Sequence, residues 1–76
     1  MKDFRTPSAA IVESLQARFA PGTRVRLGRM EDAQAPPAGS LGTVIAVDSL
    51  GTIHVAWDCG SSLGVAYGVD RCGVAL

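Results

Sequence analysis

The chain of 76 residues contains few of the side chains that enzymes and metal sites depend on. It has a single histidine, His54, and only two cysteines, Cys59 and Cys72. Structural zinc sites usually take four cysteine or histidine ligands, so these three residues predict no metal site. We also expect no cofactor. In a reducing cytoplasm both cysteines are expected to stay free, Cys72 as a small core residue and Cys59 in a turn.

Long apolar segments are also missing. No stretch approaches the roughly 20 apolar residues that a membrane-spanning helix needs. Residues 1–20 carry charges throughout and lack the continuous apolar region of a signal peptide. We therefore expect a cytoplasmic protein without a membrane partner.

Net charge is absent as well, because seven basic residues balance seven acidic ones. A neutral chain is a poor candidate for dominant non-specific nucleic-acid binding, which depends on neutralising phosphates. The charges are nevertheless unevenly distributed: the basic residues between positions 18 and 29 are arginines without an acid among them, whereas 31–70 holds acids but no lysine or arginine. Two interpretations stay open. The arginines either solubilise an exposed strand or form a face that recognises an anion.

Catalytic patterns are not recognisable either. None of the serines lies in a nucleophile-elbow pattern, and the segments Gly22-Thr23-Arg24 and Gly42-Thr43-Val44 lack the spacing of a phosphate-binding loop. His54 could pair with Asp48 or Asp58 across a sheet, but a strand histidine facing solvent is common. We predict that the protein is not an enzyme.

A short helix is predicted near the N-terminus, over residues 7–19. Thr6 is expected to cap it, and Pro7 is expected at the first helical position, which tolerates the missing N–H. One apolar face is formed by Ile11, Val12, Leu15 and Phe19. A helix of about three turns is marginal alone, so this face should pack on the barrel of its own chain or of a partner chain.

The remainder of the chain alternates between strand and turn signals. In 23–30, Val25 and Leu27 alternate with Arg24 and Arg26, which is typical of a half-buried strand. Further strands are expected at 42–48, 52–58, 61–66 and within 69–76. Gly39 suits a type II turn, and glycines 42, 51, 60, 64 and 68 suit sharp bends. The expected core is Val25, Leu27, Val44, Ile53, Val55, Trp57 and Leu63. We predict a mainly β fold, a small closed five-stranded barrel over residues 21–76 with an N-terminal amphipathic helix over residues 1–20.

A longer string of residues resembles a known family. The string comprises Pro21-Gly22-Thr23-Arg24-Val25, Met30 with Asp32, Ala35-Pro36-Pro37-Ala38-Gly39, Gly42-Thr43-Val44, His54-Val55, Trp57-Asp58, Gly60-Ser61-Ser62-Leu63 and Gly68-Val69-Asp70. It resembles domain of unknown function 4314, a family of small bacterial and phage-associated proteins, from Pro21 to about Val74. The resemblance implies an SH3-like barrel and an association with phages or mobile elements. It supplies no activity and no catalytic residues. Cys59 and Tyr67 depart from the family pattern, and the N-terminal helix lies outside the resemblance.

Five residues are candidates for a binding surface. Arg24 and Arg26 project from one face of their strand, and His54 is expected on the outward face of 52–58, near them. Tyr67 and Arg71 flank the last turn, where binding loops of barrels often lie. Salt should weaken binding at such an arginine-rich surface.

Three functions fit these candidates. The first is a non-catalytic protein-interaction module, acting through the helix or a barrel edge and able to self-associate as a homo-oligomer. The second is a nucleic-acid accessory protein that contacts phosphates through Arg24, Arg26 and Arg29. The third is a sequestering protein for a small anionic ligand such as a nucleotide, with a pocket between subunits.

Overall fold

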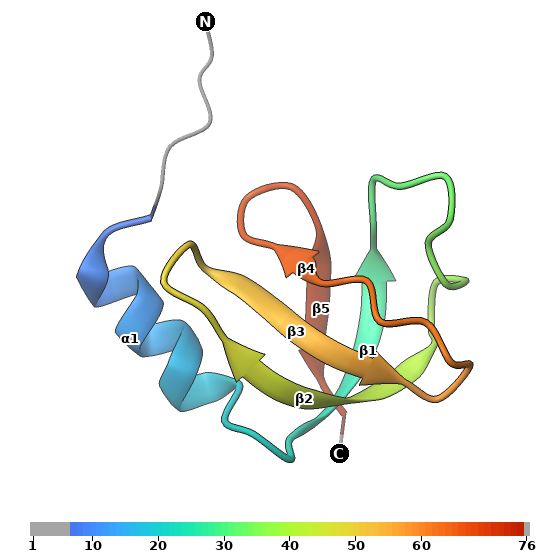
Figure 1. Cartoon of the computed structure of the whole chain (residues 1–76), viewed down its shortest axis with the longest axis horizontal. Helices are drawn as coiled ribbons and strands as arrows, with labels where there is room; N and C mark the ends of the chain where they lie inside the picture. Colours follow the sequence, from blue (N-terminus) through green and yellow to red (C-terminus); the bar gives the residue numbers. More distant parts are fainter. Residues whose placement is uncertain (1–6, 76) are drawn as a thin grey trace, which may run out of the picture.

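The structure is a computed structural model that describes residues 7–75 of the chain. Its elements are α1 (Ala9–Arg18), β1 (Arg24–Arg29), β2 (Leu41–Val47), β3 (Thr52–Trp57), β4 (Val65–Ala66) and β5 (Arg71–Val74). Figure 1 shows the helix on one side of a strongly curled sheet. The predicted mainly β class, with five strands and one N-terminal helix, is confirmed.

All five strands belong to one antiparallel sheet with the order β4-β3-β2-β1-β5. The first four strands follow one another as neighbours, and β5 returns to pair with β1. The two ends of the sheet, β4 and β5, are joined by the short 67–70 segment and contact each other. The sheet is therefore curled toward closure, with β4 and β5 as its edges (Figure 1).

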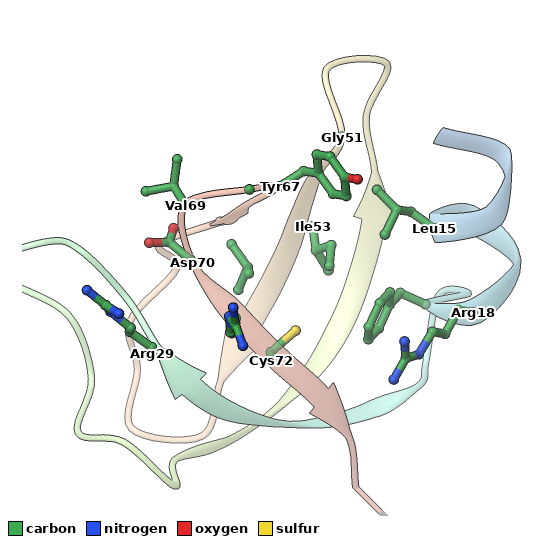
Figure 2. Close-up of a pocket in the computed structure, with 13 residues that line it drawn as sticks. Leu15, Arg18, Arg29, Gly51, Ile53, Tyr67, Val69, Asp70 and Cys72 are labelled. Atoms are coloured by element: carbon green, nitrogen blue, oxygen red, sulfur yellow. The ribbon is translucent and has the colours of Figure 1, made fainter. Parts of the chain in front are cut away.

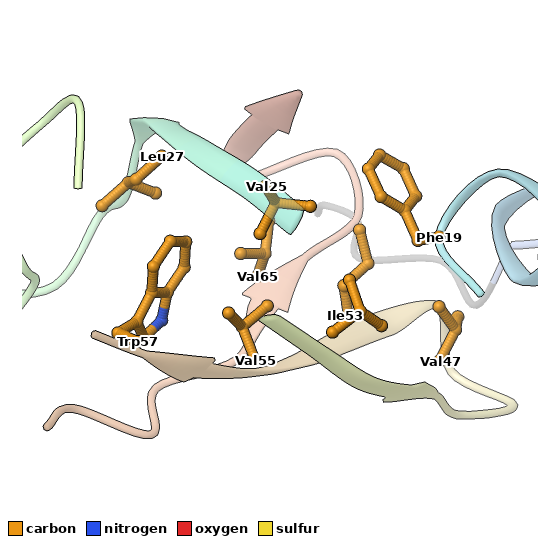
Figure 3. Packing of buried hydrophobic residues seen from close by; sticks show 9 residues of the cluster. Phe19, Val25, Leu27, Val47, Ile53, Val55, Trp57 and Val65 are labelled. Carbon is orange, nitrogen blue, oxygen red and sulfur yellow. The ribbon is translucent and has the colours of Figure 1, made fainter. Parts of the chain in front are cut away.

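The interior is filled by the alternating apolar residues of the strands. In β1, Val25 and Leu27 are buried while Arg24 and Arg26 face outward, as the sequence pattern predicts. The main cluster consists of Phe19, Val25, Leu27, Val44, Val47, Ile53, Val55, Trp57 and Val65, most of which are labelled in Figure 3. Six of the seven predicted core residues are thus confirmed.

Leu63 is the exception, because it is only half-buried. The predicted strand 61–66 forms only at its end, as β4, and Val65 supplies the buried side chain. The backbone of Leu63 has a different role: its carbonyl accepts a hydrogen bond of 2.8 Å from Nε1 of Trp57. This bond satisfies the one polar atom of the buried indole, which would otherwise be costly to bury.

The helix begins later than the sequence predicts. Ser8 is its cap, since the Ser8 hydroxyl accepts a hydrogen bond of 3.2 Å from the amide of Ile11. Pro7 therefore precedes the cap and does not start the helix, which corrects the prediction. The expected cap, Thr6, lies outside the described residues. A serine at position 8 competes successfully for this role because it is also a strong cap former.

The helix packs on the barrel of its own chain. Val12 and Phe19 are buried, and Phe19, just after the helix, belongs to the main core cluster. Ile11 and Leu15 are only half-buried, so part of the predicted apolar face stays open. Among the described residues, no helix is long and apolar enough to cross a membrane.

Two predicted glycine roles are resolved by the backbone. Gly39 has a φ of +89°, and the amide of Ser40 donates to the carbonyl of Pro37, which confirms the predicted type II turn. Gly42 was expected at a bend, but it lies within β2 without a positive φ. A Cβ there would come within 2.6 Å of a Val55 methyl and 2.8 Å of the Trp57 ring, so Gly42 is required for close packing instead.

Candidate functional site

Arg24 on the outer face of the sheet is held by a carboxylate of the same chain. Its guanidinium donates two hydrogen bonds to Asp58, of 2.9 and 2.6 Å, and one of 2.8 Å to the hydroxyl of Thr43. The bond from Arg24 keeps the pKa of the Asp58 carboxyl below its ordinary value. Arg24 therefore has a bidentate partner before any ligand arrives.

The other two outer-face candidates are also engaged within the chain. Arg26 donates a hydrogen bond of 3.3 Å to the carbonyl of Gly39. Nε2 of His54 lies 2.8 Å from Oδ2 of Asp48, one of the two pairings that the sequence suggested. The hydrogen bond with His54, followed by one from the amide of Thr52, lowers the pKa of Asp48.

A second candidate site is a hollow between the C-terminal end of α1 and the start of β5. This cavity has a volume of about 530 Å³ and is open to solvent. Figure 2 shows it between α1, β3 and the segment that leads into β5. Phe19, Ile53 and Val65 form its apolar wall. The curled sheet leaves this space because β4 is only two residues long and does not extend along β5.

Three arginines from three different elements line the cavity: Arg18 at the end of α1, Arg29 at the end of β1 and Arg71 at the start of β5. Arg18 lies 5.2 Å from the centre of the Phe19 ring, and Nε of Arg29 donates to Glu31 at 2.6 Å. Within residues 7–75, neither Arg18 nor Arg71 forms an ion pair. The guanidinium groups of Arg18 and Arg71 can therefore bind an anion without first breaking an ion pair with an acidic residue of the described chain.

Among residues 7–75, Asp70 is the acidic residue that lines the cavity, and each of its oxygens accepts a backbone hydrogen bond. Oδ1 accepts a hydrogen bond of 2.8 Å from the amide of Glu31, and Oδ2 accepts one of 3.0 Å from the amide of Ala66. These bonds tie the loop after β1 to the turn between β4 and β5. Asp70 thus shapes the cavity and offsets part of the positive charge that the three arginines bring to it.

A shallower, apolar hollow of about 320 Å³ continues from the cavity along α1. Ala10, Ile11 and Ser14 line it, and it shares Leu15, Arg18 and Tyr67 with the cavity. The Tyr67 side chain lies at the junction and is 48% exposed. We call the two hollows together the α1–β5 groove. One end of this groove carries the arginines and the other end is apolar.

The structure separates the five sequence-predicted binding residues into two groups. Tyr67 and Arg71 line the groove, whereas Arg24, Arg26 and His54 do not line it. The register pairs Arg24 with Thr43, and Thr43 in turn with Ala56, which places β2 between the arginines and His54.

Arg18 is a groove residue that the sequence analysis did not select for binding, whereas Leu15, also in the groove, belongs to the helix face that was expected to make contacts. A weak signal exists, since their spacing of three positions places an arginine at the edge of the apolar helix face. That signal does not identify β5 as the element across from Arg18.

The thiols and carboxylates do not form a metal site among residues 7–75, where no group of three potential ligands comes together. Cys59 is exposed in the turn after β3, and Cys72 lies half-buried in the wall of the groove. Burial raises the pKa of the Cys72 thiol, and the nearby charge of Arg18 opposes this shift. The raised pKa favours the protonated thiol, which is not the reactive form.

Comparisons with known proteins identify a family without an assigned activity. A family model described as "Domain of unknown function (DUF4314)" matches residues 8–75. The match includes α1, so the expectation that the N-terminal helix lies outside the resemblance is wrong. Neither a curated protein nor a solved structure matches the chain.

Proposed function

The chain belongs to the family described as a domain of unknown function (DUF4314), and we propose that it is a non-catalytic protein-interaction module. Its α1–β5 groove receives an acidic segment of a partner protein. The observation that carries this proposal is the convergence of Arg18 and Arg71, which form no ion pair within residues 7–75, on one cavity with an apolar wall. Arginine suits carboxylate recognition because its planar donors match both oxygens of the acid.

The shape of the groove favours a polypeptide ligand. The apolar hollow beside α1 extends the arginine-lined cavity, and both remain open to solvent. A peptide offers an acidic side chain for one end and an apolar side chain for the other. Tyr67 at the junction supplies an apolar ring with a polar tip, a combination that is enriched at protein interfaces.

A nucleotide is the second candidate ligand. The cavity volume of about 530 Å³ lies within the range of small-molecule sites, roughly 300–1,000 Å³. Phosphate would meet the same arginines, and a base could stack on Tyr67. This candidate places the nucleotide in a cavity within one chain, whereas the sequence analysis expected a pocket between subunits.

Nucleic-acid binding through the outer face has less support. Of the three arginines considered for phosphate contacts, Arg24 is held by Asp58 and Arg29 by Glu31. Each would have to exchange a carboxylate for a phosphate, which reduces the net gain in free energy. A cytoplasmic location, self-association and a link to phages or mobile elements stay predictions from the sequence.

An array of eight-residue peptides tests the proposed function. Each peptide carries a central glutamate and varied neighbours, and a second array carries glutamine in its place. The full chain should bind members of the first array and lose most of that binding on the second. Peptides selected in this way are then labelled for affinity measurements by fluorescence anisotropy.

Two matched variants locate the binding site. Arg71→Gln should lower the affinity for the labelled peptides by about tenfold or more, as expected for a lost charge-assisted hydrogen bond. Arg26→Gln, which removes an arginine outside the groove, should change affinity less than about twofold. Equal losses in both variants, or no binding to any glutamate peptide, would contradict the proposed function. Tight binding of ATP alone would favour the second candidate.

A further inference from the structure

The strand β5 has one edge that pairs with β1 and one edge without a strand partner among residues 7–75. It stands at the end of the sheet order, and within the described part of the chain it pairs with β1. The groove that contains Arg71 and Cys72 opens beside this strand, toward α1 (Figure 2). The first half of the free edge, at Arg71 and Cys72, therefore borders the proposed binding groove.

The hydrogen-bond pattern shows which amides face away from β1. The amide of Ala75 donates to the carbonyl of Arg24 at 2.8 Å, and Gly73 lies opposite Arg26. Because the direction of backbone bonds alternates along an antiparallel strand, the amides of Cys72 and Val74 point to the other edge. These two residues present N–H and C=O groups in the spacing that an added strand requires.

Space is available beside this edge. The cavity of about 530 Å³ borders the start of β5 at Arg71 and Cys72, and Val74 is 38% exposed. Natural proteins usually protect an open sheet edge by pairing it, covering it or placing charge on it. Here a single arginine begins β5, and the space between the strand and α1 is the cavity.

We propose that the acidic segment binds as an added β-strand along the free edge of β5, with its carboxylate directed toward Arg71 and Arg18. This inference rests on the proposed function and specifies how the groove is used. Backbone bonds to Cys72 and Val74 supply affinity that does not depend on sequence. The arginines select an acidic residue of the added strand, and the apolar hollow beside α1 selects an apolar residue of the same strand.

Charge argues for a partner other than a second copy of this chain. The β5 strand carries Arg71 and no acidic residue, and the described groove has Arg18 beside it. Pairing two β5 edges would bring these positive charges together, and like charges at close range oppose association. An acidic strand neutralises the same charges.

The test uses the glutamate peptides selected on the full chain and changes only backbone donors and acceptors. One peptide set carries N-methyl groups at alternate residues and a second set carries them at the intervening residues. Only one of the two sets loses the N–H groups that bond to β5. The affinity of that set should fall by about tenfold or more, while the affinity of the other set should stay within about threefold of that of the unmethylated peptide.

A protein variant makes the complementary change. Val74→Pro removes an amide that points away from β1, so the β1–β5 ladder is retained. Val74→Pro should lower the affinity for the peptides by about fivefold or more. Val74→Ala, which keeps the amide, should change this affinity less than about twofold. Circular dichroism of both variants checks the fold. If Val74→Pro unfolds, the two methylated peptide sets still decide the question on the unmodified chain.

Amide hydrogen exchange gives an independent result. Exchange at Cys72 and Val74 should slow when peptide binds, because these amides become bonded to the new strand. Equal affinity of both methylated sets, with unchanged exchange at Cys72 and Val74, would overturn strand addition. The proposed function would survive that result if Arg71→Gln still weakened binding. Formation of homodimers through β5, shown by concentration-dependent mass, would also overturn the inference.

Discussion

At the scale of single residues, the arginines of this chain have different partners although they look alike in the sequence. Arg24 is held in a bidentate pair by Asp58, whereas Arg18 and Arg71 have no acidic partner among residues 7–75. Exposed ion pairs contribute little to stability, so the pair on the sheet face matters mainly because it occupies Arg24. In the groove, Arg18 and Arg71 are therefore the arginines available for an external anion.

Gly42 provides a residue-scale prediction about packing. Gly42→Ala would bring a methyl group within 2.6 Å of Val55 and 2.8 Å of Trp57, so we expect destabilisation of about 1–3 kcal/mol. Gly73→Ala is the matched control, because it is also a strand glycine and nothing lies within 4 Å of its added Cβ. Urea unfolding of both variants measures the difference. Similar stabilities for the two variants would contradict the close packing of Gly42 against Val55 and Trp57.

Asp48 provides a prediction about pH. Its pKa in the folded chain is lowered from the ordinary value of 3.8 by His54 and by backbone amides. Stability from this carboxylate is therefore fully present above pH 3.8 and is lost as the pH falls through the lower folded pKa. Asp48→Asn should destabilise the protein near neutral pH, and its difference from the parent should shrink in acid. Denaturation curves at several pH values measure this difference, and a constant difference would contradict the assignment.

At the scale of elements, the sequence predicts the strands and the helix well and their ends less well. Alternation identifies β1 and β3 to within about two residues, because one face of each strand is buried and the other is not. The strand predicted at 61–66 is too long, because only Val65 and Ala66 pair with β3. Pairing depends on where a partner strand lies, and local sequence does not contain that information.

The helix gives the element-scale prediction. Phe19, 3% exposed, joins α1 to the core, so Phe19→Ala should cost about 3–5 kcal/mol of stability. Ile11→Ala, on the half-open part of the same face, should cost less because the side chain is only partly covered. Thermal unfolding of both variants compares the two costs. An equal loss in both would mean that the helix docks through a different face.

At the scale of the whole molecule, the candidate site is a consequence of topology. Tyr67 and Arg71 could be selected from the sequence because they flank a turn, but Arg18 could not be joined to them. Only the return of β5 beside β1, together with the packing of Phe19, places the end of α1 across from β5. The same topology leaves Arg24, Arg26 and His54 outside the groove that Tyr67 and Arg71 line, so the predicted single surface becomes two.

The central claim is that an acidic segment binds in the α1–β5 groove and not on the outer face of the sheet. The most direct measurement is a two-dimensional NMR titration of the isotope-labelled full chain with a selected glutamate peptide. We predict that the amide shifts concentrate in residues 15–19 and 67–74 and that added salt weakens them, because salt screens exposed charges. Shifts centred instead on Thr43, His54 and Ala56, with residues 67–74 unchanged, would contradict the account.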